Sequence, residues 1–164
     1  MLVIANSLRE LNFRALMEVY IEGNRENAGE NYPDLPPEQG LLRAEQDFYD
    51  YLREDFFRQA GAIYAIWASD GRYVSALRLE PYRDGLLLEA LETAPDARQR
   101  GYATALMEAV LERLPGKRIY SHVRKRNLPS RKTHEKCGFR EMLDYAVYLD
   151  GSVDRRSLTL CREG

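Results

Sequence analysis

A short basic segment in the middle of the chain has the residues of an anion-binding loop. It follows an apolar stretch, opens an amphipathic one, and consists of Arg98, Gln99, Arg100, Gly101, Tyr102 and Ala103. Where a loop opens a helix, the first backbone N–H groups lack partners and point outward at the positive end of the helix dipole. Gly101 and the small Ala103 let an anion approach the backbone, and the arginines add positive charge. The segment predicts a phosphate or pyrophosphate site, with solvated helix surface as the alternative.

A second polar segment, further along the chain, also carries residues suited to chemistry. Asn127, Ser130, His134 and Cys137 recur at helical spacing and therefore share one face. That face is polar where a core-facing stripe would be apolar, which predicts that it looks onto a ligand or a polar groove. A Cys137–His134 nucleophile pair is one alternative, but a small buried thiol is the ordinary interpretation of this cysteine.

Apolar periodicity and turn residues predict the strands that position these groups. Strands are expected at residues 2–5, 62–68, 73–79, 86–93 and 118–124, followed by a closing hairpin of 139–149 and 155–161. Asp70-Gly71 and Asp150-Gly151 are expected to form hairpin turns. The three strands from residue 62 to residue 93 are therefore expected to form an antiparallel meander.

The same patterns predict four helices, at residues 8–22, 41–59, 100–114 and 127–138. Ser7 is the predicted N-cap of the first helix, with Glu10 as its capping-box partner and Gly23 as its end. Residues 24–40 are rich in Asn, Gly, Pro and Glu and are predicted to form a long loop. The order of the elements indicates an α+β fold with one mixed sheet, in a single domain that spans residues 1–164.

Composition excludes several classes of protein. The 164 residues are 45% hydrophobic and 30% charged, as expected for one globular domain. The net charge of −2 gives no global attraction to nucleic acid or to an anionic membrane. The two cysteines match neither a disulfide framework nor a zinc site, and no metal is expected. The sequence shows no signal-peptide core and no membrane-spanning run, so a cytoplasmic location is expected.

The charge is unevenly distributed along the chain. Residues 1–60 are rich in acids, whereas residues 117–140 hold nine basic residues and a single acid, Glu135. The basic stretch suits a polyanionic ligand, and the acidic stretch suits a cationic one. Nucleic-acid binding is the weaker alternative, because Tyr120 is the only aromatic residue of the basic stretch up to Lys136 and base stacking is poorly provided.

Taken together, the two segments resemble the GNAT superfamily of N-acetyltransferases. The resemblance rests on Arg-x-x-Gly-x-Ala at 98–103 between a strand and an amphipathic helix, then a strand and Asn-x-x-Ser at 127–130, ending in Glu-Lys-x-Gly-Phe at 135–139. These motifs cover residues 86–139, and the order of the flanking elements extends the resemblance over nearly the whole chain. It implies a three-layer fold, whose mixed, mostly antiparallel central sheet of about seven strands is flanked by about four helices.

The resemblance also implies how acetyl-CoA would be held. Backbone amides of residues 98–104 would hold the CoA pyrophosphate, and the backbone at Leu91–Thr93 would pair with the pantetheine arm as if it were another strand. Asn127 and Ser130 would contact that arm or its phosphates. Nearby basic residues, above all Arg131 and Lys132, would meet the 3′-phosphate. The implied contacts are Leu91, Thr93, Arg98, Gln99, Arg100, Gly101, Tyr102, Ala103, Thr104, Asn127, Ser130 and Arg131.

The sequence departs from the family's pattern at His134. Family members often have a tyrosine four residues after the position of Ser130, which acts as general acid toward the departing thiolate. An imidazolium with a pKa of about 6.5 can donate that proton but is only partly charged at neutral pH. His134 is therefore either the general acid or a structural substitute for the tyrosine. His122, on the preceding strand, is expected only to satisfy a local hydrogen bond.

Glu89 and Glu92 are the candidate bases. A lysine-like amine has a pKa of about 10.4 and must lose a proton before it can attack. The two glutamates are an odd number of residues apart, so a regular strand points them to opposite faces unless a bulge intervenes. The resemblance favours Glu89, because family bases often lie shortly before the CoA-pairing segment. A structural role on the surface is the alternative for either glutamate.

The predicted activity is direct transfer of acetyl from acetyl-CoA to a primary amine, in a ternary complex with a small molecule or a peptide. A domain that binds acetyl-CoA without catalysis is the alternative, since the family's tyrosine is missing. Acids at residues 24–40 favour a cationic acceptor, although solvated surface charge also explains them. The sequence leaves open whether the protein is a monomer or a homodimer.

Overall fold

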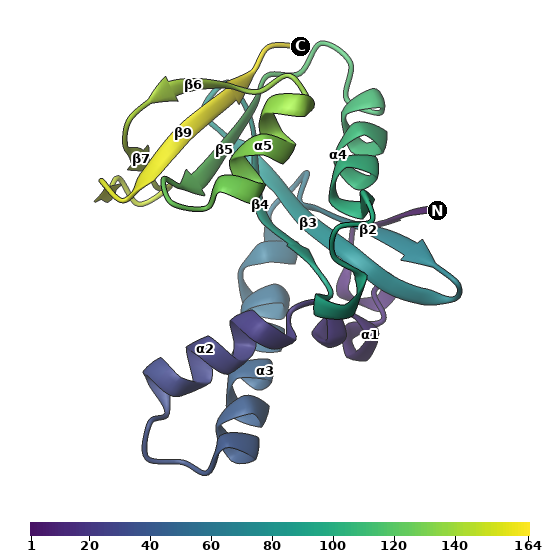
Figure 1. Cartoon of the computed structure of the whole chain (residues 1–164), viewed down its shortest axis with the longest axis vertical. Helices are drawn as coiled ribbons and strands as arrows, with labels where there is room; N and C mark the ends of the chain where they lie inside the picture. Colours follow the sequence, from purple (N-terminus) through teal and green to yellow (C-terminus); the bar gives the residue numbers. More distant parts are fainter.

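A seven-stranded sheet forms the centre of the molecule in the computed structural model, which describes residues 1–164 (Figure 1). In spatial order the strands are β1 (Leu2–Ala5), β2 (Ile63–Ser69), β3 (Arg72–Tyr82), β4 (Gly85–Thr93), β5 (Ile119–Arg124), β9 (Ser157–Arg162) and β6 (Arg140–Leu143). Every neighbouring pair is antiparallel except β4–β5. The predicted mixed, mostly antiparallel sheet of about seven strands is confirmed.

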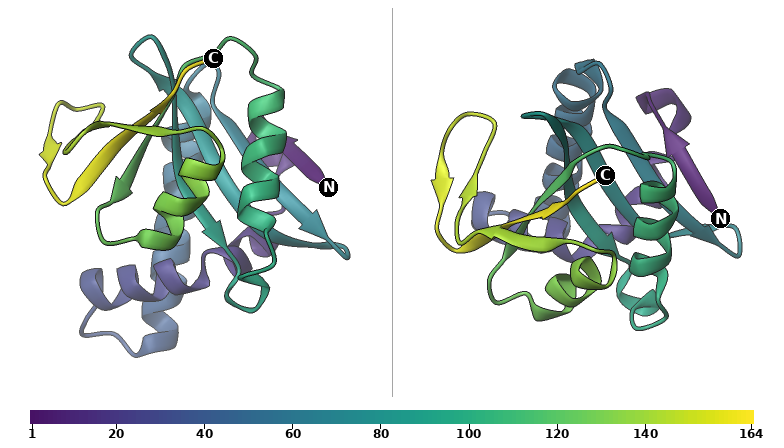
Figure 2. Two further views of the ribbon diagram at one scale, coloured as in Figure 1. Left: turned by 45° about the horizontal axis from the view of Figure 1, so that its top comes forward. Right: turned by 90° about the horizontal axis from the view of Figure 1, so that it is seen from above.

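Five α-helices cover the two faces of this sheet, one more than expected. They are α1 (Phe13–Val19), α2 (Ile21–Asn31), α3 (Pro37–Glu54), α4 (Tyr102–Glu112) and α5 (Leu128–Lys136). Figure 2 shows α4 and α5 on one side of the sheet and the N-terminal helices on the other. Short 3-10 turns lie at Leu8–Glu10, Phe56–Arg58 and Pro95–Ala97. No helix combines the length and hydropathy needed to cross a bilayer.

Alternating side chains of β3 join the two cores of the domain. Leu77 and Leu79 pack with Leu106 and Val110 of α4, whose apolar residues recur at helical spacing. The residues that alternate with them point to the opposite face, where Ala76 lies in a second cluster with residues of α1, α3 and β2. The sheet therefore has a helical layer on each face, as the family resemblance implies.

The predicted turn between β2 and β3 is confirmed. Asp70 and Gly71 both have positive φ, 51° and 76°. A two-residue turn of this kind needs positive φ at both central positions, which is why Asp-Gly is favoured there. The turn sets the β2–β3 register, in which Ser69 faces Arg72.

The predicted cap of the first helix is wrong. Ser7 makes no side-chain capping bond, and the chain forms a 3-10 turn before α1 begins at Phe13. Asn12 caps α1 instead, because its Oδ1 accepts from the Ala15 N–H at 3.1 Å. The Glu10 carboxylate accepts from the Asn6 N–H, at 2.6 Å, and so stabilises the turn rather than a capping box.

The long loop predicted at 24–40 is also wrong. Helix α2 runs through Gly23 to Asn31, α3 begins at Pro37, and only residues 32–36 connect them. Ala28 is buried, and a Cβ added at Gly40 would lie 3.4 Å from its Cβ, so small residues let the two helices pack closely. This packing outweighs the low helix propensity of the Asn- and Gly-rich sequence. The two helices form a hairpin that projects beyond the sheet (Figure 1).

The closing hairpin is only partly as predicted. β6 pairs with β9, but the chain then breaks from the main sheet and forms a separate two-stranded unit of β7 (Ala146–Val147) and β8 (Val153–Asp154). The register of β6 shifts between Glu141 and Leu143, which ends regular pairing early. The turn at Asp150-Gly151 lies at the tip of this unit, where the Gly151 N–H donates to the Tyr148 carbonyl.

Candidate active site

The parallel strands β4 and β5 pair over only three residues and then diverge. The paired residues are Leu86–Ile119, Leu87–Tyr120 and Leu88–Ser121. The ladder begins where Gly85 lies against the Arg118 carbonyl oxygen, which a Cβ at this glycine would approach to 2.0 Å. Beyond Leu88 the two strands separate into a V, visible in Figure 1 below the point where they meet. The backbone of the second half of β4 therefore has no β5 partner.

A bulge in this second half of β4 turns both candidate bases to one face. Arg78 pairs with Glu89 and Ala76 pairs with Glu92, so three steps on β4 match two steps on β3. The extra residue is accommodated at Ala90, whose φ is 54°. Glu89 and Glu92 consequently lie on the same side of the sheet as α1 and α3. The opposite-face arrangement expected for a regular strand does not occur.

A cavity of about 670 Å³ lies between the end of β4, the start of α4 and the face of α5. It contains ten of the twelve predicted cofactor contacts, and Glu92 among the predicted catalytic residues. Its lining residues are Glu22, Leu91, Glu92, Thr93, Ala97, Arg98, Gln99, Gly101, Tyr102, Ala103, Thr104, Asn127, Pro129, Ser130, Thr133 and Lys136. The structure thus brings the two sequence segments together at one cavity.

The start of α4 presents free backbone donors to this cavity. Gln99 and Gly101 have positive φ, 61° and 79°, and these angles turn the chain sharply into the helix. The first helical hydrogen bond joins the Ala105 N–H to the Gly101 carbonyl at 3.0 Å. The amides of residues 102–104 precede that bond, lack helical partners, and lie at the positive end of the helix dipole. Such a helix start binds phosphate groups.

The two arginines of the basic segment are placed differently. Arg98 lines the cavity, where its Nη2 pairs with the Glu22 carboxylate at 2.5 Å and its Nε donates to the Thr93 carbonyl at 3.4 Å. Arg98 therefore ties the start of α2 to the end of β4. Arg100 is exposed and lies outside the cavity lining.

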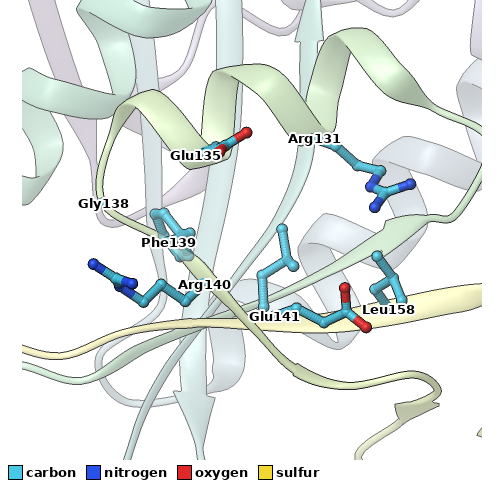
Figure 3. A pocket seen from close by; sticks show the side chains of 8 residues that line it. Arg131, Glu135, Gly138, Phe139, Arg140, Glu141 and Leu158 are labelled. Carbon is cyan, nitrogen blue, oxygen red and sulfur yellow. The ribbon is translucent and has the colours of Figure 1, made fainter.

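Helix α5 supplies the opposite wall. Asn127 caps it by accepting from the Ser130 N–H at 3.3 Å, which confirms the predicted cap. Arg131 does not line the main cavity: its guanidinium donates to the Lys125 carbonyl at 2.9 Å. It borders a second cavity of about 620 Å³ between α5 and the strands β6 and β9, where Figure 3 shows its side chain pointing toward the strands. Lys136 is the basic residue that α5 brings to the main cavity.

His134 is buried, with only 1% of its surface exposed. Its Nδ1 lies 2.8 Å from the Ser130 carbonyl and its Nε2 lies 2.8 Å from the Ser121 hydroxyl. The carbonyl only accepts, so Nδ1 carries the proton and Nε2 accepts from the serine. Burial lowers the pKa of His134, with the bond to the Ser130 backbone acting in the opposite direction. The imidazole is therefore neutral at pH 7 and both nitrogens are occupied.

The surroundings of Glu89 raise its proton affinity. Burial is the main cause, the nearby Glu80 carboxylate adds to it, Arg78 opposes it, and the pKa of Glu89 rises to about 7. Arg78 Nε lies 3.6 Å from Glu89 Oε1, too far for a good hydrogen bond, and both atoms are buried without a hydrogen-bond partner. The pKa of Glu92 is raised as well, chiefly by burial. The Glu89 carboxyl group is therefore suited to accept a proton near neutral pH.

Several lining residues were not anticipated from the sequence. Pro129, Thr133 and Lys136 follow one another at helical spacing, so the periodicity of α5 could have identified them. Glu22 lies far away in the sequence and reaches the cavity through its ion pair with Arg98. His122 is a further correction, because its Nε2 is buried without the local hydrogen bond that was expected.

Comparison with solved structures supports the fold. The ribosomal-protein-S18-alanine N-acetyltransferase of Escherichia coli superposes with a TM-score of 0.60 at 19% identity, covering 99% of this chain and 94% of that one. PaiA N-acetyltransferase from Thermoplasma acidophilum, solved in complex with coenzyme A, gives a TM-score of 0.63 at 14% identity, covering 100% and 99%. At these identities the likeness concerns the fold alone. A comparison with curated protein sequences finds no match.

A family assignment comes from the sequence itself. The model of the acetyltransferase (GNAT) family matches residues 21–139, which is most of the chain and includes β4, α4, β5 and α5. This range contains both segments that meet at the main cavity. The match, the seven-stranded sheet and the splayed β4–β5 pair agree, and the chain belongs to the acetyltransferase (GNAT) family.

Proposed function

We propose that the protein is an N-acetyltransferase that moves the acetyl group of acetyl-CoA directly to a primary amine. The observation that carries this proposal is the cavity that joins the free amides of α4 to the unpaired backbone at the end of β4. The free amides can donate hydrogen bonds to a pyrophosphate. The unpaired strand backbone can pair with the amide groups of an extended arm such as pantetheine. The reaction requires no metal.

The lining residues support CoA binding at this cavity. Amides of residues 102–104 and the positive dipole of α4 suit the pyrophosphate. The backbone at Leu91–Thr93, which β5 does not pair, suits the amides of pantetheine. Asn127 and Ser130 lie across the cavity from it, and Lys136 supplies charge for a phosphate. Arg131 and Lys132 are retained as candidates for the 3′-phosphate at the outer side of α5.

Glu89 is the proposed general base. Its carboxyl group faces away from α4 and α5, toward the side from which an acceptor would approach the thioester. With a pKa of about 7, its ionised and protonated forms are both populated near neutral pH. Glu92, on the same face after the bulge, is the second candidate. Acetyl-CoA supplies the activated acyl group, and the carboxylate removes a proton from the incoming ammonium.

For His134 we favour a positioning role over that of general acid. Nε2 accepts from Ser121 of β5 and Nδ1 donates within α5, so the ring fastens the helix to the strand. A neutral imidazole has no surplus proton to give to a thiolate. This arrangement also supports the second candidate function, a domain that binds acetyl-CoA without turnover.

The proposed acceptor is a cationic amine of a small molecule or a peptide. Glu22 lines the cavity, and Glu26 follows it one turn later on the exposed surface of α2. Both carboxylates raise the pKa of Glu92, although burial contributes most, so they lie close enough to act electrostatically on the site. Carboxylates beside the path to the thioester attract a positively charged substrate.

Thermal unfolding with acetyl-CoA, CoA and dephospho-CoA tests the cofactor site. At a hundredfold excess over Kd, binding should stabilise the fold by about 2.7 kcal/mol, which is several degrees in Tm. A smaller shift with dephospho-CoA would assign basic residues to the 3′-phosphate. Turnover is then tested with a panel of amines, by measuring the release of the CoA thiol from acetyl-CoA. A Tm that does not change with acetyl-CoA contradicts the whole proposal, and binding without thiol release selects the non-catalytic alternative.

A further inference from the structure

His122 stands on β5 at the point where the V opens. The last paired residues of the two strands are Leu88 and Ser121, so Glu89 and His122 are the next residue on each. Paired residues of parallel strands share a face, as Leu87 and Tyr120 do in one apolar cluster. Glu89 and His122 therefore occupy matching positions on the two arms of the V, on the face opposite α4 and α5.

The imidazole of His122 is held by aromatic packing and not by polar partners. The rings of Tyr82 and Tyr148 meet it edge to face at 5.6 Å and 5.4 Å. Its Nε2 is buried and has no hydrogen-bond partner, one of only four such side-chain atoms in the chain. Buried polar atoms are nearly always paired, so an unpaired one beside the diverging strands β4 and β5 points to a ligand contact.

Burial and the charged groups around His122 together lower its pKa. Burial lowers its pKa most, Arg83 lowers it further, and Asp154 acts in the opposite direction. Tyr82 and Tyr148 are the titratable side chains in ring contact with it. His122 thus presents a lone pair that can accept a proton, unlike His134, whose lone pair is already bonded.

The stoichiometry of the reaction leaves a role for a second proton acceptor. An ammonium acceptor brings three N–H protons and the amide product keeps one. Of the two protons lost, one ends on the sulfur of CoA and one is released to solvent. A single carboxylate would have to pass on the first proton before it could accept the second. Two proton acceptors on opposite sides of the nitrogen can each take one proton.

We propose that His122 is a catalytic residue that receives a proton from the acceptor amine through Nε2, across the V from Glu89. This inference rests on the proposed acetyltransferase function and adds a residue to its acceptor side. Tyr148, 40% exposed at the tip of the β7–β8 unit, is the ring whose displacement opens His122 to the amine. An aromatic wall with neutral imidazole on one arm and carboxylate on the other suits a primary alkylammonium group.

Two variants test the proposal with matched packing. His122→Phe keeps a ring between Tyr82 and Tyr148 but removes both nitrogens, and His122→Gln offers a hydrogen-bond acceptor that cannot take the proton. We expect kcat/KM for the best amine of the panel to fall about 10²-fold in both. In His122→Gln the loss should lie in kcat rather than in the KM of the amine. The Tm shift with acetyl-CoA should be unchanged in both variants.

A measurement without turnover separates this inference from the proposed function. The chain has only two histidines, so ring-labelled imidazole signals in the CoA-loaded protein are readily assigned with His122→Phe. Addition of n-butylamine should move the His122 signal and leave that of His134 in place. A shift supports the amine contact even if no amine is acetylated, in which case only the enzyme assignment fails. The role of His122 is overturned if kcat/KM is unaltered in both variants. It is also overturned if the His122 signal does not move when n-butylamine is added.

Discussion

The Tyr20 hydroxyl donates a hydrogen bond of 2.7 Å to the Ala90 carbonyl, across 70 residues of sequence. The contact joins the end of α1 to the bulge that turns Glu89 and Glu92 to one face. Alanine at positive φ costs about 1–2 kcal/mol, so the bulge needs support from its surroundings. The bulge, and with it the proposed acceptor side of the site, is therefore supported by a residue at the end of α1, far away in the sequence.

Tyr20→Phe should weaken the bulge without disturbing the cofactor cavity. Loss of one buried hydrogen bond should lower the free energy of unfolding by about 1 kcal/mol, measured by urea denaturation. The value of kcat/KM for the amine should fall, while the Kd of acetyl-CoA stays unchanged. Tyr73→Phe is the matched control, since its hydroxyl bonds the Asn12 N–H at 3.3 Å in an exposed place. Equal effects of the two variants on kcat/KM would show that the bulge does not depend on this bond.

Glu89→Gln should abolish the acidic limb of the pH–rate profile. In the wild-type protein kcat/KM should rise with pH through about 7, as the base ionises. The variant should be slower by about 10²–10⁴-fold and lack that rise. A variant that keeps both its rate and the limb would move the role of base to Glu92.

Glu89→Gln should also change how the free energy of unfolding depends on pH. The folded-state pKa of Glu89 is raised from 4.5 to about 7, so between these values the native state holds a proton that the unfolded chain has lost. Stability contributed by this group is present below pH 4.5 and declines as the pH rises to about 7. Glu89→Gln should remove this decline, which urea titrations at several pH values can measure. The decline would persist in the variant if other groups caused it.

Gly101→Ala should weaken binding of acetyl-CoA. Gly101 has φ 79° and a Cβ there would meet nothing within 4 Å, so the penalty is conformational, about 1–2 kcal/mol. Gly71 in the β2–β3 turn has φ 76° and equal space, and lies outside the cavity lining. Gly71→Ala should cost similar stability but leave the Kd of acetyl-CoA unchanged, measured by calorimetry. Equal affinities in the two variants would separate the α4 start from CoA binding.

His134→Gln distinguishes a positioning residue from a general acid. Disturbing two buried hydrogen bonds should lower the free energy of unfolding by about 1–3 kcal/mol. If His134 only holds α5 against β5, the alkaline limb of the kcat profile should keep its pKa in the variant. Disappearance of that limb would restore the acid role. Because the folded-state pKa of His134 is lowered, wild-type stability should fall as the pH drops below about 6.5.

Much of the sheet and the cofactor side could be predicted because short-range signals determine them. The Asp70-Gly71 turn, the apolar face of α4 and the Asn127 cap depend on neighbouring residues, and each is where the sequence places it. The cavity beside α4 follows from these elements, since a helix start exposes its amides regardless of the rest of the fold.

The acceptor side could not be predicted because long-range contacts determine it. The bulge at Ala90 is supported by Tyr20. Helix α2 forms against its intrinsic propensity because Ala28 and Gly40 allow it to pack on α3. The periodicity around His134 indicated a polar face, but only the three-dimensional position of Ser121 explains why His134 itself is buried. Single-sequence patterns contain none of these distances.

The three-residue ladder between β4 and β5 is the only seam that joins the two parts of the sheet. A cut near Pro115-Gly116, in the loop after α4, would divide the chain into a fragment with β1 to β4 and a fragment with β5 to β9. Each fragment carries part of the cavity: the first holds Leu91 and the start of α4, and the second holds Asn127 and Lys136. Neither fragment alone forms the whole cavity, so acetyl-CoA binding at the proposed site should report on reassembly of the two fragments. We expect the two fragments to complement each other, with the proposed cofactor spanning the cut.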